Sequence, residues 1–135
     1  MNMTNDAENL LDVTRIKLSA LWIALMLTYL LGDVMRIFSG DFVAGEMVGA
    51  QTSQELYLGM AVLFVIPIIM VFMTLTLSYK ANRWANMIMA VIVFAVNFYA
   101  LLGYESAYDV YLAIVGLVFN VIVFWLALRW KWSDE

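Results

Sequence analysis

The sequence predicts an all-α protein, an integral membrane bundle of four transmembrane helices. Hydrophobic residues make up 65% of the 135-residue chain and charged residues only 13%. A soluble domain needs about a quarter of its residues charged to cover its surface. The few charges also gather in clusters, and each apolar run between them is long enough to cross roughly 30 Å of hydrocarbon.

The first predicted span covers about residues 18–38. It follows a polar, acidic N-terminal segment, residues 1–14, which we expect in the cytoplasm. Asp33 and Arg36 fall in the last turns of this span. Residues 39–54 contain three glycines and are too polar to be a span, so they predict a turn or a short interfacial segment.

The second predicted span, about residues 56–79, has no charged residue. Thr52 or Ser53 can cap its first turn, which also contains Glu55. Pro67 lies in its middle and predicts a kink, because proline has no N–H and its ring clashes with the preceding turn. The short linker that follows, residues 80–83, predicts a tight antiparallel hairpin of spans two and three.

The third and fourth predicted spans cover about residues 84–103 and 108–128, with a short turn between them. The fourth ends at a basic, tryptophan-rich run at the membrane interface, and residues 133–135 form a cytoplasmic tail. Four spans leave no room for a separate soluble domain. Residues 15–132 are therefore predicted to form one bundle.

The charges also predict an orientation in the cell (inner or plasma) membrane, with both termini cytoplasmic. In that orientation six of the seven basic residues lie inside and only Arg36 lies outside, as the positive-inside rule requires. All five tryptophans fall toward the inner ends of the spans, and most tyrosines fall toward the outer ends. We interpret these aromatic residues as interfacial anchors.

The chain contains neither cysteine nor histidine. Disulfides, thiolate or imidazole metal sites, and cysteine or histidine catalysis are therefore excluded. We expect no cofactor, no metal site and no enzymatic activity. The net charge of −4 argues against nucleic acid as a partner, since nucleic acid requires a basic face.

Two runs of sequence resemble a known family. They are RIKLSALWIALM at the start of span one and YKANRWANMI at the start of span three. Both are similar to an uncharacterised family of small bacterial and archaeal four-helix membrane proteins, classified only as a domain of unknown function. The resemblance covers nearly the whole chain and implies a four-span bundle, but it supplies no activity or site. The small multidrug exporters are of similar size, yet the middle of span one here, residues 22–28, lacks their membrane-embedded glutamate.

A polar stripe in span one is the main candidate site. Tyr29, Gly32, Asp33 and Arg36 follow the i, i+3, i+4, i+7 spacing of one helix face, which we expect to face the other helices. Charges within a span cost roughly 2.5–3.5 kcal/mol each, so they are functional candidates. One interpretation is a structural ion pair of Asp33 with Arg36, both side chains reaching toward the headgroups. The other is an outward-facing polar pocket.

Acidic residues near the same end extend this candidate pocket. An excess of acids would attract cations, and repulsion among converging carboxylates would favour one that carries a proton. The full candidate set is Tyr29, Asp33, Arg36, Glu55, Glu105 and Asp109.

Three asparagines form a second candidate set. Asn86 and Asn97 are three helical turns apart and share a face of span three. Asn97 and Asn120 both fall near the middle of the membrane, where they could hydrogen-bond across spans. We interpret all three as interhelical packing contacts, with a water-filled path as the alternative. Glycines at positions 59, 103 and 116 predict close helix packing.

The favoured function is a non-enzymatic accessory, scaffold or oligomer-forming bundle, since no charge lies in the middle of a span. Its partners would be the lipid bilayer and a second copy of the chain or another membrane protein. The alternative is a small cation- or proton-coupled transporter or channel that uses the outward-facing pocket around Asp33 and Arg36. Four short spans enclose little volume, so a transport path would require an assembly.

Overall fold

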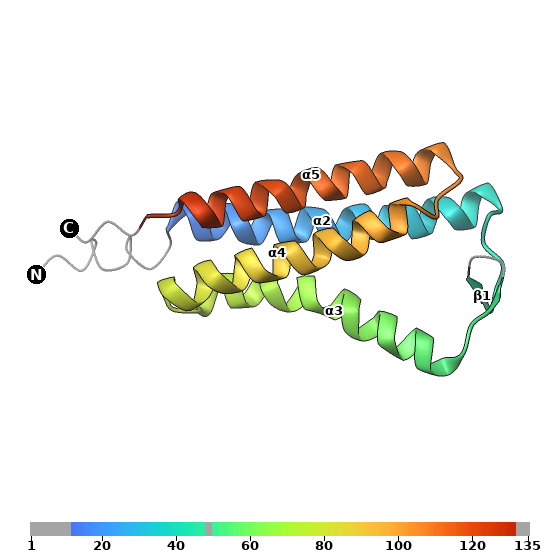
Figure 1. The fold of residues 1–135 in the computed structure, drawn as a ribbon, viewed down its shortest axis with the longest axis horizontal. Helices are drawn as coiled ribbons and strands as arrows, with labels where there is room; N and C mark the ends of the chain where they lie inside the picture. Colours follow the sequence, from blue (N-terminus) through green and yellow to red (C-terminus); the bar gives the residue numbers. More distant parts are fainter. Residues whose placement is uncertain (1–11, 48–49, 132–135) are drawn as a thin grey trace, which may run out of the picture.

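The computed structural model describes residues 12–47 and 50–131, so the expected N-terminal segment up to residue 11 and the tail at 133–135 lie outside the described residues. The described chain forms four long helices (Figure 1): α2 (Val13–Ser39), α3 (Gln54–Thr76), α4 (Tyr79–Leu101) and α5 (Ala107–Arg129). Each is long and apolar enough to cross a membrane. The predicted all-α four-helix membrane bundle is confirmed.

Polar residues precede the four helices, and a glycine ends α2. Asp12 precedes α2, and its carboxylate accepts a hydrogen bond of 2.9 Å from the N–H of Thr14. Ser53 caps α3, as the sequence predicted, by accepting from the N–H of Leu56 at 3.3 Å. Gly40 ends α2 in a left-handed conformation with φ 80°, which glycine adopts without the steric cost that a Cβ would add.

The predicted linker at residues 80–83 is wrong. Helix α3 ends at Thr76 and α4 begins at Tyr79, so the turn is Leu77–Ser78 and residues 80–83 lie in the first turns of α4. Both turn residues have extended backbones. A contact of Asn82 explains this early start. The last carbonyls of a helix have no N–H donor within that helix, and Asn82 Nδ2 supplies one by donating at 2.6 Å to the Thr74 carbonyl of α3.

The connection between α2 and α3 contains a short antiparallel hairpin. Strand β1 (Glu46–Met47) pairs with β2 (Ala50–Gln51), with Glu46 opposite Gln51. The N–H of Thr52 closes this hairpin by donating to the Gly45 carbonyl at 2.9 Å. A turn or a short interfacial segment was predicted for residues 39–54, and the structure adds this pair of short strands.

The two ends of the bundle differ in charge. We call the end formed by the start of α2, the α3–α4 turn and the end of α5 the basic end, and the opposite end the acidic end (Figure 1). Six basic residues lie toward the basic end: Arg15, Lys17, Lys80, Arg83, Arg129 and Lys131. The acidic end contains Arg36 and all the carboxylates from Asp33 to Asp109.

The buried residues of helix α3 all lie in its second half. They are Pro67, Met70 and Thr74, and in its first half Leu58 remains 67% exposed. Figure 1 shows α3 diverging from the other three helices toward the acidic end. Pro67 lies where the packed half begins, and it leaves the Leu63 carbonyl without its usual helical N–H donor, which allows the helix to bend there.

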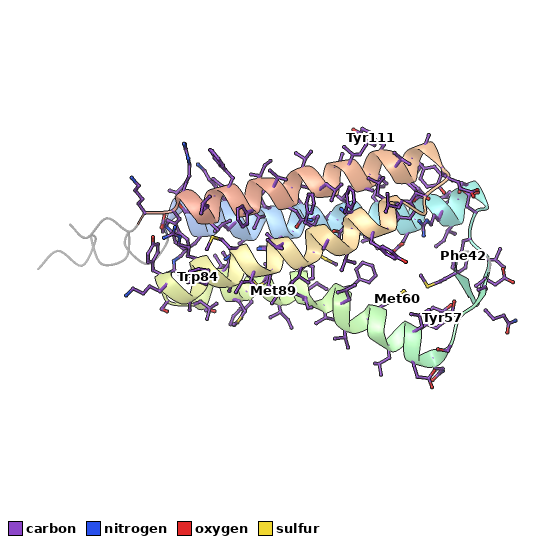
Figure 2. All side chains as sticks on the ribbon, in the orientation of Figure 1. Phe42, Tyr57, Met60, Trp84, Met89 and Tyr111 are labelled. Atoms are coloured by element: carbon purple, nitrogen blue, oxygen red, sulfur yellow. The ribbon has the colours of Figure 1, made fainter. Side chains whose placement is uncertain are left out.

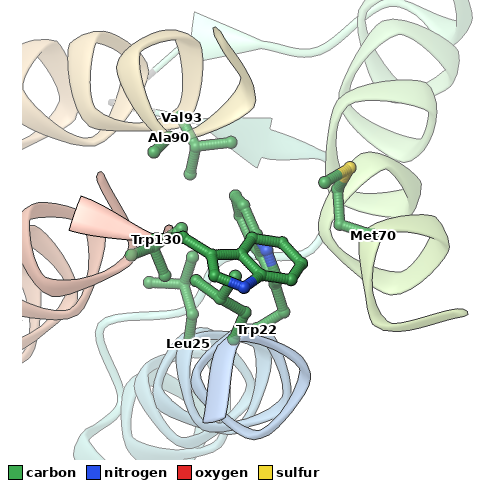
Figure 3. Close-up of a cluster of buried hydrophobic side chains, with 8 residues drawn as sticks. Trp22, Leu25, Met70, Ala90, Val93 and Trp130 are labelled. Atoms are coloured by element: carbon green, nitrogen blue, oxygen red, sulfur yellow. The ribbon is translucent and has the colours of Figure 1, made fainter. Parts of the chain in front are cut away.

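The buried core lies in the basic half and the middle of the bundle. Trp22 and Leu25 of α2 meet Met70 of α3 and Val93 of α4 (Figure 3). Trp22 is 0% exposed, so its interpretation as an interfacial anchor is wrong.

The other tryptophans divide into two kinds. Trp130 is also buried, and its indole N–H donates at 2.6 Å to the Asp12 carboxylate, so it too is not an exposed anchor. Trp84 and Trp125 are more than half exposed, as an anchor would be, and Figure 2 shows Trp84 near the basic end. Trp132 lies outside the described residues. Of the four described tryptophans, the two that are buried are those whose indole N–H donates to a side chain, Asn86 for Trp22 and Asp12 for Trp130.

Candidate functional site

A pocket lies at the acidic end, where the first half of α3 diverges from the bundle. Its volume is about 100 Å³. Hydrocarbon side chains from α3 and α4 form part of its wall, among them Leu63, Phe64 and Val96. We call it the acidic-end pocket, and its polar lining residues are Thr28, Tyr29, Asp33, Arg36, Asn97, Tyr104 and Asp109.

The polar stripe predicted in span one faces this pocket. Tyr29, Gly32, Asp33 and Arg36 all line it. Helical periodicity is the reason, since these four positions lie on one face of α2. Above Gly32, Leu112 of α5 approaches closely, with its Cδ1 3.6 Å from where a glycine Cβ would stand.

Arg36 pairs with Asp109 of α5, and the interpretation of an Asp33–Arg36 ion pair is wrong. The Arg36 Nε lies 3.1 Å from Oδ1 and 3.2 Å from Oδ2 of Asp109. The guanidinium also lies 4.8 Å from the centre of the Tyr104 ring. Asp109 is in the first turn of α5, where the helix dipole stabilises a negative charge.

This ion pair is partly shielded from solvent. The Arg36 and Asp109 side chains are 32% and 11% exposed. Such a pair is less screened than a surface salt bridge. It therefore joins α2 to α5 at the acidic end.

Asp33 is left without an ionic partner. Within the described part of the chain it has no ion pair and no hydrogen bond, although it lies near both Arg36 and Asp109. With both carboxylates ionised, the two carboxylates and one guanidinium that line the pocket sum to one negative charge, and this charge lies on the exposed Asp33.

Two residues of the candidate set lie elsewhere. Glu55 is exposed in the first turn of α3, and Glu105 is exposed in the turn before α5. Neither lines the acidic-end pocket. The structure therefore brings together Tyr29, Asp33, Arg36 and Asp109, and it does not add the two glutamates to them.

Asp41 joins the ends of α2 and α5 beside the pocket. Its carboxylate accepts hydrogen bonds from the hydroxyls of Tyr108, Ser39 and Ser106. These donors, Tyr108 foremost, hold the pKa of Asp41 below its usual value. The carboxylate is thus ionised at neutral pH. It links the end of α2 to the start of α5, the two helices that also contain Arg36 and Asp109.

The asparagines at mid-bundle do not bond to one another. Asn97 donates instead to the Ala113 carbonyl of α5 at 3.2 Å. Asn120 is 1% exposed, and its amide lies beside the Tyr29 phenol of α2, with no hydrogen bond to Asn97. The cross-span bond expected between Asn97 and Asn120 is therefore wrong.

Gly116 allows these helices to approach. A Cβ at this position would lie 2.7 Å from Nδ2 of Asn97 and 3.3 Å from the Tyr29 ring. Close packing was predicted here and is confirmed. At Gly59 a Cβ would meet nothing within 4 Å, so close packing at that glycine is wrong. It lies in the half of α3 that diverges.

Asn86 belongs to a hydrogen-bond network nearer the basic end. Its Oδ1 accepts from the Trp22 indole at 2.7 Å and from the Thr74 hydroxyl at 3.3 Å. Its Nδ2 donates at 2.7 Å to Oδ1 of Asn82. These contacts join α2, α3 and α4, so Asn86 is an interhelical contact as the sequence analysis interpreted it.

Sequence reasoning missed three residues of these sites. Asn82 was placed in a linker, but it continues the spacing of Asn86, Ala90, Val93 and Asn97 on the buried face of α4. Tyr104 was placed in a turn, and no periodicity marks it. Phe64 lies in a uniformly apolar span, so the composition does not indicate which side of that helix faces the other helices.

The lining residues limit the chemistry of the pocket. The described residues contain no group of three or more acidic, histidine or cysteine side chains able to hold a metal ion. The pocket provides one unpaired carboxylate, two phenols, one amide and hydrocarbon walls. It can therefore admit a small polar head group, while the apolar remainder of the molecule lies along the hydrocarbon walls.

Comparison with known proteins gives one match. No curated protein and no solved structure matches the chain significantly. Residues 10–135 match a family of unknown function, DUF6326, over nearly the whole length of the chain. The protein therefore belongs to the DUF6326 family, in agreement with the resemblance seen in its sequence.

Proposed function

We propose that this membrane protein is a non-enzymatic binding protein that admits an amphiphilic molecule into its acidic-end pocket. The observation that carries the proposal is the divergence of α3, because it leaves a pocket with its charged groups on α2 and α5 and mainly hydrocarbon on α3 and α4. Ligand sites of proteins combine apolar walls with a few polar groups in this way.

The lining favours binding over catalysis. Arg36 and Asp109 are held in their mutual ion pair, and the Thr28 hydroxyl donates to the Ala24 carbonyl of its own helix. General acid–base chemistry needs a proton donor and a proton acceptor placed around a reacting bond. The free groups here suit recognition of a head group.

The proposed orientation puts the pocket in the outer leaflet, with both termini cytoplasmic in the cell membrane. The six basic residues at the opposite end support it through the positive-inside rule. Reporter fusions at the C-terminus test it. A fusion active only in the cytoplasm agrees with this orientation, and an exported signal contradicts it.

Photolabelling tests the binding function directly. The protein in lipid nanodiscs is irradiated with a long-chain alcohol that carries a diazirine in its chain, and the labelled residues are identified by mass spectrometry. We expect adducts on half-buried Leu112, which lines the pocket, as well as on lipid-facing Val118. Labelling of Val118 without Leu112 would contradict the proposal.

A matched pair of variants sharpens this test. Ala100→Phe places a ring in the pocket wall and should remove the Leu112 adducts while leaving those on Val118. Ala95→Phe is the control, because Ala95 is exposed on the same helix and does not line the pocket. Equal labelling of Leu112 in both variants would count against the pocket as the binding site.

Transport of a cation or proton is the second candidate function. The unpaired Asp33 favours it, whereas the packed side chains of Leu25, Met70 and Val93 below the pocket argue for a closed path. A flux in proteoliposomes that Asp33→Asn abolishes, at unchanged expression and fold, would establish transport. If the natural protein supports no flux, transport is ruled out and binding remains the proposed function.

Association with a second copy or another membrane protein is a further proposal from the sequence. An accessory protein must contact a partner, so crosslinking in native membranes should capture a stable complex. Recovery of the monomer alone, under conditions that crosslink a known oligomer, would count against an accessory or oligomer-forming role.

A further inference from the structure

We propose that the acidic-end pocket selects amphiphiles with a single positive charge, such as alkylammonium compounds. The proposal rests on the binding function above and adds the charge of the ligand to it. It follows from the balance of charges in the pocket, from the aromatic rings beside Asp33 and from the position of the hydrocarbon walls.

Charge balance selects a monovalent cation. Arg36 neutralises Asp109 at 3.1 Å, and Asp33 has no ion pair within the described chain, so one negative charge is left in the pocket. A carboxylate next to hydrocarbon is stabilised when a cation approaches it, because the local dielectric is lower than that of water. One bound ammonium group brings the pocket to neutrality.

The same balance disfavours other ligands. An anion would meet Asp33 without a free cationic partner, since the Arg36 guanidinium already contacts Asp109 and the Tyr104 ring. A divalent metal ion prefers several oxygen ligands, frequently more than one of them a carboxylate. The described residues contain no group of three acidic side chains for it.

Aromatic rings add a preference for an ammonium head. Tyr29 and Phe64 both line the pocket, and their ring centres are 5.9 Å apart at an interplanar angle of 69°. Tyr29 is one helical turn from Asp33 on the same face of α2. A cation that pairs with Asp33 can therefore also contact ring faces, which attract organic cations.

The hydrocarbon walls account for the apolar part of the ligand. Leu63 and Phe64 lie on α3, and Val96 lies on α4. An alkyl chain between these helices stays among apolar groups while its head reaches Asp33. The chain gains little by moving from lipid to pocket, so selectivity comes from the head.

Competition against the photolabel tests this selectivity. Decyltrimethylammonium, decanol and decyl sulfate are added at equal mole fractions in the bilayer, and the Leu112 adducts are measured. We expect the ammonium compound to displace the label at about a tenfold lower mole fraction than the alcohol, as one charge-assisted contact provides. The sulfate should be no better than the alcohol.

Variants assign the effect to Asp33. Asp33→Asn should abolish the tenfold advantage, and Asp33→Glu should retain it because the charge is kept. Glu55→Gln is the matched control, since it removes an exposed carboxylate at the same end that does not line the pocket. If all acidic residues acted through surface potential, both neutral variants would lose the same advantage, and the proposal would be overturned.

The outcomes separate the two proposals. If the natural protein shows no Leu112 adducts, the binding function itself fails. If Leu112 is labelled but the three competitors act equally, or the sulfate acts best, the binding function stands and cation selection is overturned. An advantage of the ammonium compound that survives in Asp33→Asn also overturns it.

Discussion

The two ends of the bundle use similar polar residues for different purposes. Nearer the basic end, Trp22, Thr74, Asn82 and Asn86 hydrogen-bond to one another across three helices. At the acidic end, Asp33 faces a pocket with no such partner among the described residues. Buried polar groups stabilise a bundle where partners satisfy them, whereas an exposed carboxylate such as Asp33, with no partner in reach, is available to a ligand.

Helix α3 causes this difference. Its second half contributes Met70 and Thr74 to the packed region, whereas its first half leaves the bundle after Pro67 in the direction of the acidic end (Figure 1). At the acidic end α3 therefore does not pack tightly against the other three helices, as it does in the basic half. Arg36–Asp109 and the Asp41 contacts join α2 to α5 there without filling the space.

The largest effect is expected from breaking the network. Asn86→Leu leaves the Trp22 indole and the Thr74 hydroxyl without their acceptor, at roughly 1–3 kcal/mol for each buried unsatisfied group. We expect the free energy of unfolding to fall by about 2–4 kcal/mol. Unfolding by SDS in mixed micelles, followed by circular dichroism, measures it.

Asn120→Leu is the matched control for this prediction. The amide of Asn120 interacts with the Tyr29 phenol and makes none of the several hydrogen bonds that hold Asn86. The loss of unfolding free energy should therefore be clearly smaller than for Asn86→Leu. Equal losses in the two variants would contradict the distinction between the networked asparagine and Asn120.

The second effect concerns the middle of the bundle, where the two regions meet. Gly116→Ala brings a methyl group within 2.7 Å of Asn97 Nδ2. We expect a loss of about 1–3 kcal/mol in the unfolding free energy, as overpacking produces. Gly59→Ala, in the unpacked half of α3, should cause no loss, because its Cβ meets open space. A loss at Gly59 of similar size would show that α3 packs along its whole length.

The third effect separates the paired from the unpaired charge at the acidic end. Arg36→Gln leaves the mostly buried Asp109 without its counter-ion and should lower the unfolding free energy by about 1–2 kcal/mol, between the values for exposed and buried pairs. Asp33→Asn should leave stability unchanged. The same SDS titration measures both, and a larger loss for Asp33→Asn would reverse the assignment.

The smallest effect is a pH dependence at Asp41. Its pKa is lower in the folded protein than its usual value of 3.8, so its contribution to stability is present at neutral pH and is lost as the pH falls through the folded pKa. Asp41→Asn should lower the melting temperature slightly at about pH 7, and its difference from the natural protein should shrink as the pH is lowered below 3.8. A difference that persists at low pH would contradict a role for the charged carboxylate.

Part of the candidate site could be predicted from the sequence. The stripe of Tyr29, Asp33 and Arg36 lines the pocket because residues at helical spacing share a face whatever they pack against. The partner of Arg36 could not be predicted in the same way. Asp109 is 73 residues away in the chain, and Asp33 is nearer in sequence. Contact between them depends on how α2 and α5 align.

The sequence by itself determined that this chain forms four apolar helices with a basic and an acidic end. Hydropathy and charge are local properties, and each span is long enough to be recognised alone. Only the tertiary structure decided that Trp22 is buried, that Arg36 pairs with Asp109, and that α3 leaves a pocket beside Asp33. Lipid and a helix core are equally apolar, so composition cannot tell which face of a span meets another helix.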